Sequence, residues 1–186
     1  VGADGTISLN AAGSSDVIVD ITGYFKAGGG FVATTPARAL DTRSVGSSAF
    51  GPAETRPLTI AGSHGVPAGA TSVSVNITVT GPSQSGWLTA WPGGAAMPTA
   101  SVINFGADQT IANGIVVGLG NDGTLNLNND HGTAHVVVDV MGYSTGGGFT
   151  PISPARMLDT RSSAALRVGA GQTVTLDVTG TLGVPE

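Results

Sequence analysis

The sequence has 186 residues, of which 40% are hydrophobic and only 10% charged, a balance that supports a packed core and excludes an intrinsically disordered chain. The net charge of −5 and seven scattered basic residues argue against nucleic-acid binding, because they cannot neutralise a phosphate backbone. The absence of cysteine excludes disulfides and cysteine-ligated zinc, and no apolar run is long enough to span a bilayer.

Seven segments have strand-like patterns. In chain order they lie near residues 57–61, 72–80, 87–91, 101–105, 110–118, 123–128 and 136–140. The segment 72–80 is the clearest, because Val, Ile and Val residues alternate with Ser, Asn and Thr, as in a strand with one buried face. The run 136–140 is apolar apart from Asp139, which suits a strand covered on both faces.

Turn signals separate these segments, and two of them are Asp-Gly pairs at 4–5 and 122–123. An Asp-Gly pair between apolar runs predicts a tight hairpin. No segment has the apolar spacing of an amphipathic helix. We therefore expect an all-β fold, an antiparallel β-sandwich of the jelly-roll or Greek-key kind.

The sequence also repeats itself. The order Gly-Gly-Gly-Phe, Pro-Ala-Arg and Leu-Asp-Thr-Arg, which begins at Gly28, returns 118 residues later from Gly146. This predicts a tandem repeat in three parts: residues 1–30 end a preceding repeat, 31–148 form one complete repeat, and 149–186 begin a following one. Two readings of the half-repeats stay open: the chain is a fragment of a longer array, or neighbouring chains complete the halves by strand addition.

These motifs resemble a known family. The order Pro-x-Arg-x-Leu-Asp-Thr-Arg, Gly-Val-Pro-Ala-Gly-Ala, Gly-Trp-Leu-Thr-x-Trp-Pro and Val-Asp-Val-x-Gly-Tyr is similar to the "LDTR" tandem repeats of large exported actinobacterial proteins, often found beside cell-wall or polysaccharide hydrolase domains. The resemblance implies an extracellular or cell-surface module, and the Gly-rich, Lys-poor composition fits an exported protein. It implies no ligand and no catalytic residue.

Recurring charged residues are the main candidate site in a chain so poor in charge. An unpaired carboxylate inside an apolar strand would be costly, so we expect a clamp of Arg–Asp pairs that ties the Leu-Asp-Thr-Arg segment to the last strand, for instance Arg43 to Asp139. A cation or ligand site made by the same carboxylates is the alternative. The clamp residues are Arg38, Asp41, Arg43, Asp139, Asp20, Arg156, Asp159 and Arg161.

Trp87 and Trp91 are four residues apart on one predicted strand and therefore on one face of it. Exposed, they would be carbohydrate contacts that stack on sugar rings. Packed in the core or under a loop, where large aromatic residues usually lie, they would only stabilise the fold. Both interpretations stay open, with burial favoured.

We expect no catalytic residue, no cofactor and no metal site. His131 and His135, with Asp130, have no histidine counterparts in the other copy, and no nucleophile elbow with a helix behind it is present. The predicted function is a non-catalytic structural module of a secreted repeat protein, in a stalk, fibre or envelope assembly, whose partners are neighbouring repeats or copies of the same chain. Binding to carbohydrate or cell-wall polysaccharide is the alternative, and a hydrolase a distant third.

Overall fold

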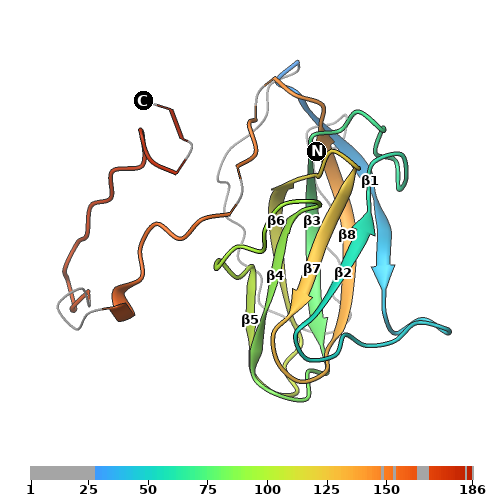
Figure 1. Ribbon diagram of the computed structural model, residues 1–186, viewed down its shortest axis with the longest axis horizontal. Coiled ribbons are helices and arrows are strands. Elements are labelled where there is room, and N and C mark those ends of the chain that lie inside the picture. The colour runs from blue at the N-terminus through green and yellow to red at the C-terminus, as the bar shows by residue number, and fades with distance from the viewer. Residues whose placement is uncertain (1–27, 148, 153, 163–167, 183, 186) are drawn as a thin grey trace, which may run out of the picture.

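Eight strands form two four-stranded antiparallel sheets that pack as a sandwich (Figure 1). The computed structural model describes residues 28–147, 149–152, 154–162, 168–182 and 184–185. The strands are β1 (Phe31–Asp41), β2 (Glu54–Thr59), β3 (Ser72–Thr80), β4 (Gly86–Pro92), β5 (Ile103–Phe105), β6 (Ile111–Gly118), β7 (Thr124–Asn129) and β8 (His135–Ser144).

The strand order is that of a jelly roll. One sheet has the order β1-β8-β3-β6 and the other has the order β2-β7-β4-β5. The first strand thus pairs with the last, the second with the seventh, the third with the sixth and the fourth with the fifth, as in a long hairpin rolled up into two layers. The expected antiparallel β-sandwich is confirmed.

The core lies between the sheets and follows the predicted alternation. In β3 the apolar residues Val73, Val75, Ile77 and Val79 are at most 1% exposed, while the polar residues after Ser72 are half-buried. From the opposite sheet, Leu88, Ala90, Leu125 and Leu127 are fully buried against them. Burying a Val, Leu or Ile side chain contributes about 1.5–3 kcal/mol, so this interdigitated layer is the main source of stability.

Strand β1 was not predicted as a strand. It contains Pro36, which has no N–H to donate and is therefore tolerated only in an edge strand or at a bulge. Both conditions hold here: β1 is an edge strand, and its register with β8 shifts between Ala33 and Ala37.

The predicted hairpin at Asp122-Gly123 is wrong. The strands on either side, β6 and β7, lie in different sheets, so the turn is a connection across the sandwich. Gly123 has a positive φ of 76°, whereas Asp122 keeps an ordinary φ and accepts a hydrogen bond from the backbone N–H of Thr124 at 3.0 Å. A side-chain bond to the backbone two residues on makes this turn without the hairpin geometry. The Asp-Gly pair at 4–5 lies outside the described residues.

Beyond β8 the described chain leaves the sandwich (Figure 1). We call residues 149–152 and 154–162 the head segment, because the sequence predicts that they begin a following repeat. It ends in a short 3-10 helix at Thr160–Ser162, and residues 168–182 are exposed and extended apart from two turns. Within the described residues no helix has the length and apolar character needed to cross a membrane.

Candidate functional site

The Leu-Asp-Thr-Arg motif ends strand β1 in a compact turn. Asp41 Oδ1 accepts hydrogen bonds from the backbone N and the Nε of Arg43 at 3.0 and 2.9 Å, and Asp41 Oδ2 accepts one from Arg43 Nη2 at 2.7 Å. The carboxylate and the guanidinium thus pair through two parallel bonds. The Arg43 side chain, followed by its backbone N–H, holds the pKa of Asp41 well below its usual range.

Arg38 makes the link to the last strand. It lies opposite Asp139 in the β1–β8 register, and its Nε donates to Asp139 Oδ1 at 2.5 Å. Its Nη1 donates to Asp41 Oδ2 at 2.7 Å, so Arg38 bridges the two carboxylates. The expected pairing of Arg43 with Asp139 is corrected: Arg38 is the hydrogen-bond partner of Asp139, and Arg43 stays with its neighbour Asp41. Asp20 lies outside the described residues.

This charged cluster lies on the surface of the sandwich. The side chains of Arg38 and Arg43 are 49% and 52% exposed, and that of Asp139 is 25% exposed. Exposed ion pairs contribute about 0–1 kcal/mol each, because water and salt screen them. The arrangement therefore mainly positions the end of β1, and its stabilising part is the pair of Arg43 with Asp41, whose side chain is only 16% exposed.

The threonine of the motif binds the last strand more deeply, and the sequence analysis missed it. Thr42 is 1% exposed, and its Oγ1 accepts a hydrogen bond from the backbone N of Val136 at 2.9 Å. Its own backbone N donates to Val136 O at 3.1 Å, and its hydroxyl also lies 3.1 Å from His135 Nδ1. Thr42 recurs as Thr160, so recurrence could have identified it. It was not among the candidates because these were the recurring charged residues, and threonine carries no charge.

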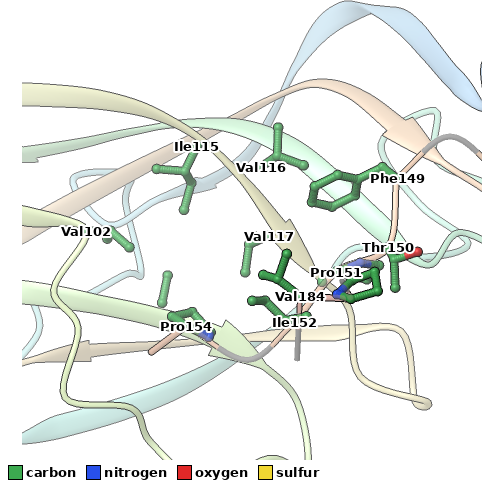
Figure 2. Close-up of a pocket in the computed structure, with 13 residues that line it drawn as sticks. Val102, Ile115, Val116, Val117, Phe149, Thr150, Pro151, Ile152, Pro154 and Val184 are labelled. Atoms are coloured by element: carbon green, nitrogen blue, oxygen red, sulfur yellow. The ribbon is translucent and has the colours of Figure 1, made fainter. Parts of the chain in front are cut away.

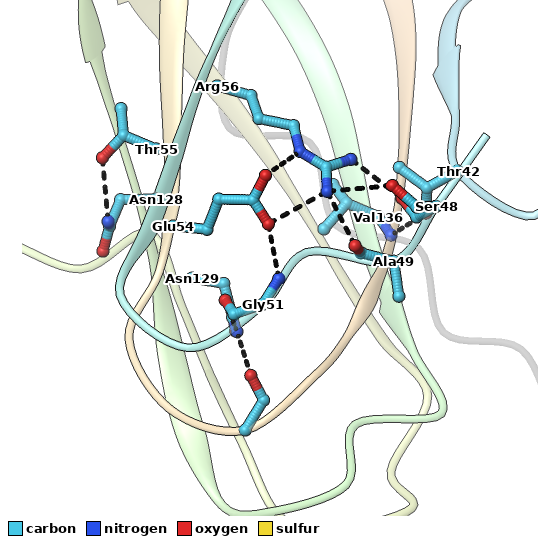
Figure 3. Close-up of polar contacts among 11 residues, drawn as sticks. Thr42, Ser48, Ala49, Gly51, Glu54, Thr55, Arg56, Asn128, Asn129 and Val136 are labelled. Carbon is cyan, nitrogen blue, oxygen red and sulfur yellow. Dashed lines mark hydrogen bonds and ion pairs between the residues drawn. The ribbon is translucent and has the colours of Figure 1, made fainter.

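A second cluster missed by the sequence analysis surrounds Arg56 on β2 (Figure 3). Its guanidinium lies 4.3 Å above the ring of buried Phe50 and donates to the carbonyls of Ser48 and Ala49 at 2.8 and 2.7 Å. It also pairs with both oxygens of Glu54, whose pKa is lowered first by Arg56 and then by the backbone N–H of Gly51. Recurrence could not reveal this cluster, because Val174 and Gln172 stand at the corresponding positions.

The second Leu-Asp-Thr-Arg motif, in the head segment, repeats the local geometry of the first. Asp159 Oδ1 accepts from the backbone N and Nε of Arg161 at 3.0 and 2.8 Å, and Asp159 Oδ2 accepts from Arg161 Nη2 at 2.6 Å. Arg161, by its side chain and then its backbone N–H, holds the pKa of Asp159 well below its usual range. Arg156 binds Asp159 at 3.1 Å and also donates to the carbonyl of Thr99 in the sandwich at 2.8 Å.

The two tryptophans differ in exposure. Both lie on the outer face of β4, since the alternate residues Leu88 and Ala90 face the core. Trp91 is only 4% exposed and donates its indole N–H to Ala95 O at 3.0 Å, so it is not available to a sugar. Trp87 is 42% exposed and makes an edge contact with His131.

An apolar cleft of about 780 Å³ lies between the head segment and the edge of the sandwich. Figure 2 shows the side chains that line it, among them Ile115, Val116 and Val117 of β6 and Phe149, Pro151 and Ile152 of the head segment. Pro151 packs close to Gly118, where an added Cβ would lie 2.9 Å from Pro151 Cβ.

Among the described residues, no group of three or more His, Asp or Glu side chains is arranged to hold a metal ion. His131 Nδ1 contacts the neighbouring carboxylate of Asp130, and His135 contacts Thr42. No known family model matches the chain, and no curated protein matches it.

Proposed function

We propose that this chain is a non-catalytic structural module of a secreted, surface-located repeat protein, which spaces or anchors other parts in a stalk, fibre or envelope layer. Its partners are neighbouring repeats or copies of the same chain. The observation that supports this is the contact between the sandwich and the head segment: Pro151 packs on Gly118 at the end of β6. In repeat proteins such contacts between successive units set their relative orientation and add to their stability.

The position of this contact supports the proposal further. Strand β6 is an edge strand, and an uncovered edge invites pairing with other chains. The head segment lies along the apolar residues at the end of β6, where Val117 is buried and Val116 stays 45% exposed, and Arg156 joins the segment to the sandwich through its bond to Thr99 O. A following module attached in this way is held by the preceding one instead of swinging on a free linker.

A distance measurement tests this arrangement. The chain has no cysteine, so spin labels attached to Val45→Cys and Met157→Cys report only the distance between the sandwich and the head segment. Both native residues are exposed, so labelling leaves the core intact. A narrow distance distribution is expected from a packed head segment. A distribution as broad as that of a flexible linker would contradict the proposal.

Saccharide binding is the second candidate function. It is favoured by the exposure of Trp87 on the outer face of a sheet. The two functions use different surfaces, because the apolar cleft contains neither tryptophan.

A further inference from the structure

A second cleft lies between the outer face of the β2-β7-β4-β5 sheet and the head segment. Its volume is about 530 Å³, within the range of roughly 300–1,000 Å³ typical of small-molecule sites. The sandwich contributes Trp87, Thr99, Ser101 and Asn104. The head segment contributes Arg156, Leu158, Asp159, Thr160 and Arg161. We call it the Trp87 cleft.

Trp87 gives this cleft a flat apolar surface. The indole makes an edge contact with the His131 ring, with centroids 5.8 Å apart and planes at 68°, and 42% of the Trp87 side chain stays exposed. Asn104 lies directly across from Trp87 in the β4–β5 register. Ser101 donates its hydroxyl hydrogen to Asn104 Oδ1 at 3.1 Å and so orients the amide beside the indole. A flat apolar ring flanked by an amide and hydroxyls matches a pyranose, which has an apolar C–H face and a polar rim.

The opposite wall carries an excess of positive charge. Two guanidinium groups, of Arg156 and Arg161, line the cleft with one carboxylate, that of Asp159. This wall is therefore positively charged, although the chain as a whole has a net charge of −5. The Arg161 side chain is 79% exposed, and Asp159 takes only part of the five N–H donors of its guanidinium. The remaining donors suit a second carboxylate, that of a ligand.

We propose that the Trp87 cleft binds an acidic saccharide. The pyranose ring stacks on Trp87, its hydroxyls bond to Asn104 and Ser101, and its carboxylate pairs with Arg161. The site is composite, because one wall belongs to the complete repeat and the other to the head of the next. The inference therefore rests on the packed head segment of the proposed function, and it adds a ligand class to a role that is otherwise only structural.

Titration of the full chain with trigalacturonate, and with maltotriose as a neutral probe, tests the site. Trigalacturonate is expected to bind more tightly than maltotriose and to change the tryptophan emission. Trp87→Ala weakens binding about tenfold or more, as loss of a central aromatic contact does. In Trp87→Phe the buried Trp91 is the one tryptophan that remains, so the tryptophan emission, excited at a wavelength that tyrosine does not absorb, stays constant while calorimetry still detects weakened binding.

Arg161→Gln and Arg43→Gln form a matched pair, since both arginines make the same local bonds to a neighbouring aspartate but only Arg161 lines the Trp87 cleft. Arg161→Gln is expected to lower the affinity for trigalacturonate about tenfold, to the level of maltotriose, while Arg43→Gln leaves it unchanged. Equal losses in both variants, or equal binding of both sugars, would overturn the acidic-saccharide site.

The spin-label distances separate the two proposals. A narrow distribution without trigalacturonate binding overturns the saccharide site and leaves the structural role standing. A broad distribution overturns the structural role, and it also removes the Arg161 wall, so that the predicted difference between Arg161→Gln and Arg43→Gln disappears.

Discussion

The Leu-Asp-Thr-Arg motif contains two kinds of contact that differ in depth. The Asp41–Arg43 pair is local, and the same pair forms at Asp159–Arg161 although the head segment forms no strand. Thr42 instead is buried and joins β1 to β8 through the backbone of Val136. The charged residues thus shape the turn, and the threonine between them holds the turn against the sandwich.

Substitution of Thr42 tests this division. Thr42→Val keeps the shape of the side chain but leaves the buried N–H of Val136 without its acceptor, which costs about 1–3 kcal/mol of the free energy of unfolding. Urea denaturation measures the loss. Thr59→Val, at an exposed position of β2, is the control and should change stability little. If the two variants unfold alike, the Thr42 contact does not stabilise the fold.

The lowered pKa of Asp41 predicts a dependence on pH. A carboxyl whose pKa is lower in the folded state stabilises that state fully above its ordinary pKa of about 3.9, and the contribution is lost as the pH falls toward the lowered value. Asp41→Asn removes the titrating group, so the unfolding midpoint of this variant should fall less steeply between about pH 5 and pH 1. Thermal melts across this range measure the slope.

Asp159→Asn is the control for the acid dependence, because Asp159 has a similarly lowered pKa but lies outside the sandwich. Its acid slope should equal that of the unsubstituted chain. A reduced slope in Asp159→Asn, or an unchanged slope in Asp41→Asn, would show that the Asp41–Arg43 pair is not coupled to unfolding of the sandwich.

Some recurring residues acquire a physical reason only in the structure. A Cβ added at Gly142 would lie 2.5 Å from the ring of Phe31, so the Gly-Tyr and Gly-Phe motifs at opposite ends of the repeat are packing partners. His64 and Leu182, which occupy the same place in the two copies, both have a positive φ, of 53° and 50°. Leucine does not predict that conformation, because the non-glycine residues enriched in the left-handed region are Asn, Asp and His.

At the scale of elements, alternation predicted the strands that have one clear apolar face, such as β3, while β1 was missed. Strand β1 mixes Pro36 and Arg38 with small residues and is half exposed, so neither propensity nor periodicity marks it. Its pairing with β8 depends on residues more than a hundred positions away, as in Arg38 with Asp139. The fold determines which distant residue pairs with β1, and the local sequence of β1 does not predict it.

The Arg56 cluster is predicted to stabilise the connection between β1 and β2. Arg56→Lys keeps the charge, but an ammonium cannot bond Glu54 and two carbonyls at once while lying flat on Phe50. We expect a loss of about 1–2 kcal/mol in denaturant unfolding, since the side chain is partly buried. Arg43→Lys, at an exposed pair, is the control. If Arg56→Lys and Arg43→Lys lower the free energy of unfolding equally, the Arg56 cluster does not stabilise the connection between β1 and β2 beyond an exposed ion pair.

For the whole molecule, the sequence predicted the sandwich but not its strand order. The same alternating strands suit a Greek key or a jelly roll, because both bury one face of each strand. The choice depends on which connections cross between the sheets, as the turn at Asp122-Gly123 does. The Trp87 cleft was only half predicted: the sequence marked Trp87 as an aromatic candidate, but the other lining residues come from two separate segments, 99–104 and 156–161.

Two glycines of β6 offer a matched test of the contact with the head segment. An added Cβ at Gly118 meets Pro151 at 2.9 Å and Pro92 at 3.3 Å, whereas one at Gly114 meets nothing within 4 Å. Gly118→Ala should therefore displace the head segment and increase trypsin cleavage after Arg156 several-fold. Gly114→Ala should cleave at the rate of the unsubstituted chain. Equal rates in all three proteins would contradict a head segment held by Gly118.

The jelly-roll order has a mechanical consequence. Phe31 at the start of β1 pairs with Ser144 at the end of β8, so the chain enters and leaves the sandwich at neighbouring points. Tension along an array would separate β1 from β8 beginning at this end, so that the hydrogen bonds between the two strands break one after another. Optical tweezers should therefore record opening at low force, with each sandwich of residues 31–144 releasing roughly 400 Å of chain. An array of such modules would be extensible and would yield one module after another under load.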